Sequence, residues 1–369
     1  MIPVRAAMAL FFYSTVVAFG DPASPEALIE AGHWKKARAI VEARLRGEPN
    51  DPAANFFLSQ IRNAFGDRES PLPLAEKAVA LDASTAKYHR QVAEVLGIMA
   101  EHAGVFQQLL LARRFRKEID TALSLDPRDI QALRDLMEYY LLAPGIAGGD
   151  AGKAAAVATS IAALNATEGF LAQARLAVFH KQTSKVEGFY RKAVEAEPGN
   201  YRARIVWAQY DLASDQPNSE SAERQAREAL ALDRGRVEAY GILAATYADR
   251  EAWNELDSIL AAVAKEVPDD AAPYYRAAER LLASGRDPQR AERYLRTYLG
   301  REPEGNQPTI AEAHWKLGLA LEAEGHAADA TAEWKEAVRL DPTSPATREL
   351  KRAKAKIPPA GAAFQSHPH

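Results

Sequence analysis

The stretch that decides the fold is AEAHWKLGLALEAEGHAADATAEWKEAVRLDP, which runs from Ala311 to Pro342. Apolar and small residues recur every three or four positions on both sides of Gly325, which predicts two amphipathic helices joined by a tight glycine turn. Small residues such as Gly318 and Ala330 allow the two helices to approach closely, and Pro342 closes the unit. The stretch is therefore predicted to be one helical hairpin with its own stop.

A comparable stop recurs along the whole chain, each time at the end of an amphipathic segment. The nine stops are Glu48-Pro49, Asp82-Ala83, Asp126-Pro127, Asn165-Ala166, Glu197-Pro198, Asp233-Arg234, Val267-Pro268, Glu302-Pro303 and Asp341-Pro342. Their spacings cluster near 34 residues, which is typical of stacked helical hairpins that bury their apolar faces against one another. Alternating strand patterns are nearly absent, so the fold is expected to be all-α.

This pattern resembles the tetratricopeptide repeat, most closely in Ala311 to Pro342 and again in Val237 to Pro268 and Ala203 to Arg234. The N-terminal copies depart more, with Pro71 where the repeat usually has alanine. The resemblance covers roughly residues 25–356. It implies a right-handed superhelical solenoid of about nine helix-turn-helix hairpins, in which Pro345 to Lys356 form a basic C-terminal capping helix.

The resemblance also implies a function. The chain is similar to exported bacterial tetratricopeptide proteins, and it is expected to be a non-enzymatic scaffold that binds a protein or peptide segment along its concave face. The alternative is an envelope-assembly component that binds a glycan or a polysaccharide-synthesis or secretion complex. Aromatic residues gathered on one exposed groove would favour the glycan, and the candidates are Trp207, Tyr210, Tyr275 and Trp315.

The two ends of the chain differ from the repeats. Arg5, the apolar run from Ala6 to Phe19 and the small-x-small sequence Ala18-Phe19-Gly20 predict a signal peptide over residues 1–20. The solenoid with its capping helix would then occupy residues 21–356, exported to a bacterial periplasm without an integral membrane span. An uncleaved anchor is the alternative. Residues 357–369 are predicted to be a disordered tail, which could itself occupy the groove.

Composition and motifs indicate no chemistry. The formal net charge of -4 and the mean hydropathy of -0.30 fit an ordered, soluble protein and argue against a nucleic-acid partner. The chain has no cysteine, and its eight histidines share no helix face at metal-binding spacing, so neither a catalytic residue nor a metal is expected. The sequence AGGDAGKA at Ala147–Ala154 lacks the first glycine and the hydroxyl of a phosphate-binding loop, so no nucleotide or other cofactor is expected either.

The concave face is expected to carry the partner-binding residues. In tetratricopeptide repeats, positions one, four and eight places after the start of each first helix point inward, which selects Lys87, Arg90, Glu94, Gln131, Arg134, Glu138, Arg202, Gln209, Tyr275, Glu279 and Trp315. Arg90, Arg134 and Arg202 could grip carboxylates of a peptide, or be neutralised within their own helices by residues such as Glu94 and Glu138. Trp315 is either an anchor for a partner or a packing residue against the capping helix.

Two long intervals mark departures from the regular repeat. The extra residues before Pro127 predict helices that overhang the stack. Those before Ala166 fall in APGIAGG, a loop that resembles a recurring insertion in exported tetratricopeptide proteins; its residues Pro144, Gly145, Ile146, Gly148 and Gly149 are either a partner contact or a turn that only separates two helices. A third extension, Glu304–Thr309, could hinge the last hairpin.

Overall fold

The computed structural model describes residues 24–214, 217–306 and 308–356, and within these ranges the chain is a succession of paired α-helices. The pairs are α1 (Pro25–Glu30) with α2 (Trp34–Gly47), α3 (Pro52–Ala64) with α4 (Pro71–Leu81), α5 (Ala86–Glu101) with α6 (Val105–Leu125), α7 (Ile130–Leu142) with α8 (Ala151–Leu164), α9 (Ala166–Phe179) with α10 (Thr183–Ala196), α11 (Tyr201–Ala213) with α12 (Ser219–Leu232), α13 (Glu238–Asp249) with α14 (Trp253–Glu266), α15 (Ala272–Ala283) with α16 (Pro288–Leu299), and α17 (Ile310–Ala323) with α18 (Ala327–Leu340). Helix α19 (Ala346–Lys356) follows and contacts α18 as the predicted cap. The all-α solenoid is thus confirmed, whereas its right-handed turn stays a prediction.

The predicted stops end the second helix of eight pairs. At Asp82, Asp126, Asp233 and Asp341 the backbone leaves the helix in an extended conformation, and the carboxylate accepts a hydrogen bond from the N–H two residues later at 2.8–3.0 Å. This aspartate turn is the physical reason why the acidic residue recurs at the stop. Glu302-Pro303 is the exception, because α16 already ends at Leu299.

From α4 to α18, each second helix buries a row of side chains at positions i, i+4 and i+7. The rows include Phe115, Ile119 and Ala122 in α6; Ala154, Ala158 and Ile161 in α8; Ala222, Ala226 and Ala229 in α12; and Ala330, Trp334 and Ala337 in α18. This spacing keeps the row on one helix face, and the frequent alanines allow the neighbouring backbones to approach. In α18 the row meets Gly318, where an added Cβ would lie 2.3 Å from the Trp334 ring nitrogen, so the glycine is required for the close contact.

The third pair departs from this regular pattern. Helix α5 has 16 residues and α6 has 21, whereas no other described helix exceeds 14. The buried row of α6 begins at Phe115, so its first ten residues extend beyond the part of the helix that the stack buries. The overhanging helices expected from the extra residues before Pro127 are therefore confirmed.

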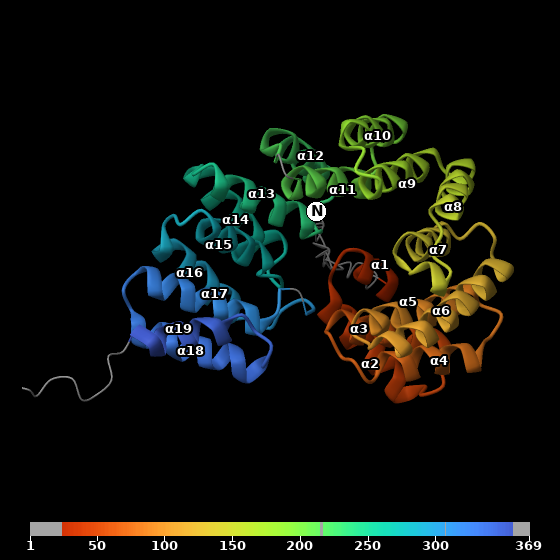
Figure 1. Ribbon diagram of the computed structural model, residues 1–369, viewed down its shortest axis with the longest axis horizontal. Coiled ribbons are helices and arrows are strands. Elements are labelled where there is room, and N and C mark those ends of the chain that lie inside the picture. The colour runs from red at the N-terminus through yellow and green to blue at the C-terminus, as the bar shows by residue number, and fades with distance from the viewer. Residues whose placement is uncertain (1–23, 215–216, 307, 357–369) are drawn as a thin grey trace, which may run out of the picture.

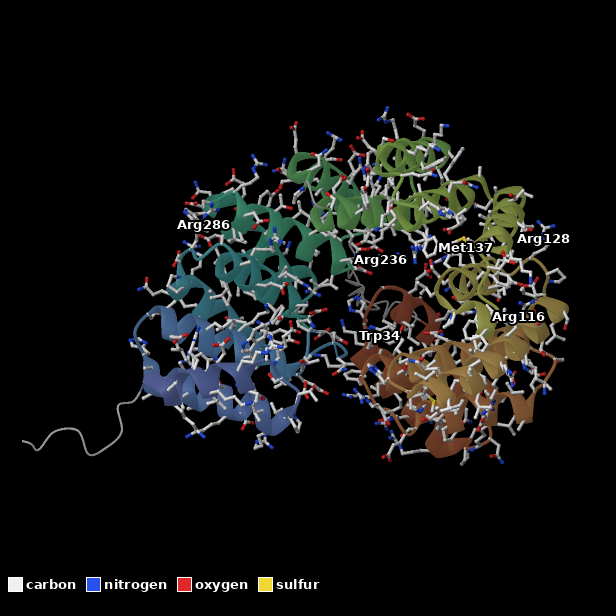
Figure 2. All side chains as sticks on the ribbon, viewed as in Figure 1. Trp34, Arg116, Arg128, Met137, Arg236 and Arg286 are labelled. Carbon is white, nitrogen blue, oxygen red and sulfur yellow. The ribbon has the colours of Figure 1, made fainter. Side chains whose placement is uncertain are left out.

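The solenoid curves until its first hairpin meets its C-terminal half (Figure 1). Figure 2 places Trp34 and Arg236 at the inner edge of this ring and Arg116, Arg128 and Arg286 on its outer side. Among the described residues, three ion pairs cross the closure: Lys36 to Asp269 at 2.6 Å, Arg38 to Glu302 at 2.7 Å and Lys35 to Glu304 at 3.9 Å. Helix α2 thus faces the turns that precede α15 and α17.

The extension at Glu304 forms the centre of this closure. The Glu304 carboxylate accepts a hydrogen bond from the Lys35 backbone N–H at 2.8 Å, and the Asn306 N–H donates to the Ala64 carbonyl at 2.7 Å. The Lys35 ammonium group donates to the carbonyl oxygens of Asp269 and Glu302, each at 2.7 Å. The expectation of a hinge is therefore wrong, because this segment is held against α2 and the end of α3.

Reversing the charges of Lys36 and Arg38 on α2 tests the closure. The Lys36→Glu/Arg38→Glu double variant replaces two attractions, each worth about 0.2–1 kcal/mol at an exposed site, by repulsions. We expect the ring to open and the radius of gyration to increase in small-angle X-ray scattering. The matched control is Arg191→Glu/Lys192→Glu on α10, which makes the same charge change away from the closure. Identical scattering curves for wild type and the α2 variant would contradict the closed ring.

Candidate partner-binding site

The predicted inner positions carry ion pairs between successive first helices. Figure 1 shows α7, α9 and α11 nearer the centre of the ring than their partners α8, α10 and α12. Arg202 on α11 pairs with Glu168 on α9 at 2.8 Å, and Arg175 on α9 binds both carboxylate oxygens of Glu138 on α7 at 2.7 Å. The inner face is thus held together by charge pairs that bridge neighbouring hairpins.

Arg90, Arg134 and Arg202, which we call the arginine ladder, already contact acidic residues of the chain. Arg90 pairs with Asp129, the N-cap residue of α7, at 3.5 Å. Arg134 lies 4.0 Å from Glu168 and donates a hydrogen bond to Gln131 at 2.9 Å, and Arg202 shares Glu168. The arginines therefore pair across hairpins rather than within their own helices, and a ligand carboxylate would have to displace these partners. The prediction of a carboxylate-gripping ladder is corrected accordingly.

The remaining predicted positions are dispersed around the ring. Lys87 pairs with Glu26 at 3.4 Å and lies 5.4 Å from the centre of the Phe56 ring, and Glu279 pairs with Lys316 at 3.2 Å. Gln209 is exposed on α11. These residues share the inner register but form no common site.

Aromatic residues do not gather on one exposed groove. Tyr275 is fully buried against Tyr298 and Trp207 is 5% exposed, so neither is available as a stacking platform. Trp315 is half-buried and packs against the C-terminal core. The Lys316 ammonium group lies 5.0 Å from the centre of its ring. The interpretation of Tyr275 as a ligand contact is wrong, and the arrangement that would favour a glycan is not formed by this set.

The two departures from the repeat meet at a cavity of about 590 Å³, which we call the α5–α7 cavity. It is lined by Glu94, Leu96, Gly97, Ile98, Ala100 and Glu101 of α5, by Val105, Gln108, Leu109, Ala112 and Phe115 of α6, and by Asp135, Glu138, Tyr139, Leu142, Ala143, Pro144, Ile146 and Ala147 of α7 and the loop after it. It therefore joins Glu94 and Glu138 of the predicted inner face to Pro144 and Ile146 of the predicted loop.

The loop is built to hold its shape. Residues Gly145–Ala147 form a short 3₁₀ turn, η1, whose last carbonyl accepts a hydrogen bond from the Tyr139 hydroxyl. Gly148 has φ 101°, and a Cβ at Gly149 would lie 1.8 Å from the Ala143 carbonyl oxygen, so both positions require glycine. Asp150 caps α8 and accepts hydrogen bonds from the N–H groups of Gly152 and Lys153. This geometry leaves Ile146 80% exposed at the cavity.

Exposed apolar side chains are concentrated around this cavity. Among the large hydrophobic residues in the described ranges, those more than 60% exposed are Val105, Phe106, Leu110, Leu142 and Ile146. Single exposed apolar residues are ordinary, but a contiguous group marks an interaction surface. All five lie on the overhanging end of α6, the end of α7 or the loop.

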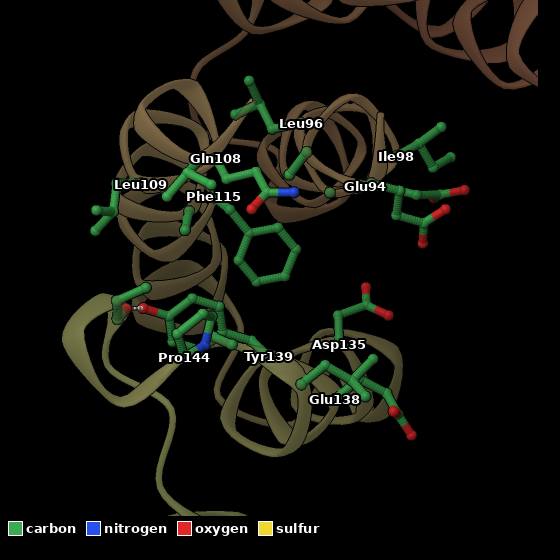
Figure 3. Close-up of a pocket in the computed structure, with 18 of the residues that line it drawn as sticks. Glu94, Leu96, Ile98, Gln108, Leu109, Phe115, Asp135, Glu138, Tyr139 and Pro144 are labelled. Carbon is green, nitrogen blue, oxygen red and sulfur yellow. Dashed lines mark hydrogen bonds between the residues drawn. The ribbon is translucent and has the colours of Figure 1, made fainter. Parts of the chain in front are cut away.

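One end of the cavity is acidic. Figure 3 shows Glu94 from α5 and Asp135 and Glu138 from α7 at this end, with the Phe115 ring between the helices. Burial, reinforced by the nearby Glu94 charge and opposed by Arg90 and Arg134, raises the pKa of Asp135 to about 7. Burial also raises the pKa of Glu94. One Asp135 carboxylate oxygen accepts from Gln131 at 3.1 Å, whereas the other is buried without a hydrogen-bond partner.

Sequence reasoning missed most of this lining, including Asp135, Ile98, Val105 and Leu142. One signal was available: VFQQLLL at Val105–Leu111 places apolar residues on too many sides for one helix face to bury. Across the described ranges, no three His, Asp or Glu side chains are placed to hold a metal ion. None of the helices described is long and apolar enough to cross a membrane.

Comparison with protein-family models found no match, and comparison with curated proteins found none either. The chain is similar to several solved structures. A thermophilic tetratricopeptide protein of Thermus thermophilus has 20% identity and a TM-score of 0.45, covering 50% of this chain and 94% of its own. Yeast Tom70 has 12% identity and a TM-score of 0.46, covering 90% and 86%. PilW, described as a type IV pilus biogenesis factor, has 15% identity and a TM-score of 0.40, covering 71% and 99%.

The raised pKa of Asp135 makes a prediction for stability. The folded chain holds this proton up to about pH 7, whereas the unfolded chain releases it near the ordinary value of 3.8, so ionisation disfavours folding as pH rises between these values. Asp135→Asn removes this term. The free energy of unfolding of Asp135→Asn, relative to that of wild type, should therefore increase by up to about 1.4 kcal/mol for each pH unit between these two values.

Urea denaturation at pH 5, 6 and 7 measures this difference. The control is Glu195→Gln, which removes an exposed carboxylate on α10. We expect the difference between Asp135→Asn and wild type to change with pH and that of the control to stay flat. A constant difference for Asp135→Asn would show that its carboxyl group is not perturbed by folding.

Proposed function

We propose that this protein is a non-enzymatic scaffold that binds a segment of another protein, and that the α5–α7 cavity is its principal docking site. The supporting observation is the group of strongly exposed apolar residues on the long helix α6, at the end of α7 and in the loop after it. A partner segment that covers this surface would recover the free energy of burying it, about 25 cal/mol per Å² of apolar area.

The cavity has the form expected of a docking site. Its volume of about 590 Å³ accommodates a few bulky side chains, and its walls come from three helices and a glycine-fixed loop. A site formed on such elements needs little ordering when the partner binds, which lowers the entropic cost of association. Phe106 and Leu110 extend the apolar surface beyond the cavity itself, so a chain segment covers it better than a small molecule does.

Export to a bacterial periplasm remains part of the proposal. It rests on the signal-peptide pattern over residues 1–20, which lie outside the described residues. The tail at 357–369 also lies outside them, so its occupation of the groove stays a prediction.

Site-directed photo-crosslinking tests the docking site in cells that produce the full chain. A photoreactive residue at Ile146 should give a discrete adduct with one partner, because this side chain lies at the cavity and is 80% exposed. The adduct should be lost when Leu142→Glu is added, since a charge there opposes apolar docking. The matched control is the same photoreactive residue at Leu232, an exposed leucine at the end of α12. A Leu232 adduct with the same partner and yield, or an Ile146 adduct that survives Leu142→Glu, contradicts the proposal.

A further inference from the structure

We propose that the α5–α7 cavity selects a segment in which an arginine or lysine stands next to bulky apolar side chains, with the cation held between Glu94 and Asp135. This inference rests on the proposed function and adds the chemistry of the ligand. The arginine ladder predicted a ligand with negatively charged groups, whereas this cavity would select a ligand with a positive charge.

The apolar wall accounts for the bulky side chains. Phe115 and Tyr139 stack at 5.4 Å with an interplanar angle of 13°, and they form a continuous aromatic surface inside the cavity. Ile98, near the end of α5, and Ile146, in the turn η1 after α7, also line the cavity. A ligand group entering here must be apolar, because a polar group without a partner would lose its hydrogen bonds to water.

The acidic end accounts for the cation. Neither Glu94 nor Asp135 forms an ion pair with any residue in the described ranges, and one Asp135 oxygen is buried without a hydrogen bond. Two carboxyl groups that share a partly dry site repel each other when both are ionised. A guanidinium or ammonium group placed between them removes this repulsion and supplies the missing donor.

The neighbouring cations of the chain form their ion pairs with other acids, and Arg90 and Arg134 offset the raised pKa of Asp135 only in part. Arg90 is drawn to Asp129, Arg134 contacts Gln131 and Glu168, and Arg175 is held by Glu138 through two hydrogen bonds. The third acid at this end, Glu138, is therefore neutralised, whereas Glu94 and Asp135 keep a demand for positive charge. An incoming cation meets this demand without breaking a pair that the fold already makes.

The test uses two capped amphipathic peptides with leucines at positions i, i+3, i+4 and i+7. One peptide carries an arginine beside the leucines; the other carries citrulline, which has nearly the same shape and no charge. Binding to the full chain is followed by fluorescence anisotropy at pH 8. We expect the arginine peptide to bind about tenfold more tightly, in line with a charge-assisted hydrogen bond in a partly buried site.

Substitutions locate the effect. Glu94→Gln/Asp135→Asn should make the two peptides bind equally, whereas Glu195→Gln on α10 should keep the preference. Ile146→Asp should weaken both peptides. Because these variants could alter folding, a second measurement uses wild type alone. The preference for arginine should shrink as pH falls from 8 to 6, since protonation of Asp135 removes its negative charge from this end of the cavity.

The outcomes separate this inference from the proposed function. Equal binding of both peptides to wild type, weakened by Ile146→Asp, overturns the selection of a cation and leaves the docking site standing. A preference for arginine that survives Glu94→Gln/Asp135→Asn also overturns it, because the charge is then recognised elsewhere. Failure of both peptides to bind contradicts both proposals.

Discussion

The structure depends on one packing constraint: each second helix from α4 to α18 buries a row of side chains at i, i+4 and i+7 against its own first helix and the helix that follows. The row is about two turns long, so it fixes how much of a helix the stack can cover. A helix that continues past its row leaves apolar residues without neighbours. This is what happens in α6, where Val105, Phe106 and Leu110 precede the row that begins at Phe115.

The same constraint explains why the site is local. The glycine-fixed turn η1 adds Ile146 beside the overhang, and the spacing of α5 and α7 leaves the cavity between them. Elsewhere on the inner face, ion pairs such as Arg202 to Glu168 and Lys316 to Glu279 connect neighbouring hairpins. These pairs leave few charged groups for a ligand. Ring closure through Lys35 and Glu304 further limits how far neighbouring hairpins can move apart. The long helix α6 and the loop after α7 thus interrupt the regular stack at the cavity, and Glu94 and Asp135 lie there.

Sequence predicted the architecture well, because stops and small residues act locally. The aspartate turn at Asp126 and the glycine turn at Gly325 depend on neighbouring residues alone. The two long intervals between stops also located the long helix α6 and the loop after α7. The arginine ladder failed because Asp129 and Glu168 belong to other hairpins, and no local pattern reveals such pairing. The prediction of Tyr275 as a ligand contact failed because this position of α15 is fully buried and packs against Tyr298 of α16. The hinge assigned to Glu304 failed because its partner, Lys35, is 269 residues away in the chain.

The central claim is that a partner segment occupies the α5–α7 cavity. Isoleucine methyl NMR on the full chain tests it most directly, because Ile98 and Ile146 line the cavity whereas Ile205 and Ile310 lie on distant helices. Titration with the leucine- and arginine-bearing peptide is predicted to shift the methyl signals of Ile98 and Ile146 and to leave those of Ile205 and Ile310 in place. Shifts confined to Ile205 or Ile310 would show that the ligand binds another part of the solenoid and would contradict the account.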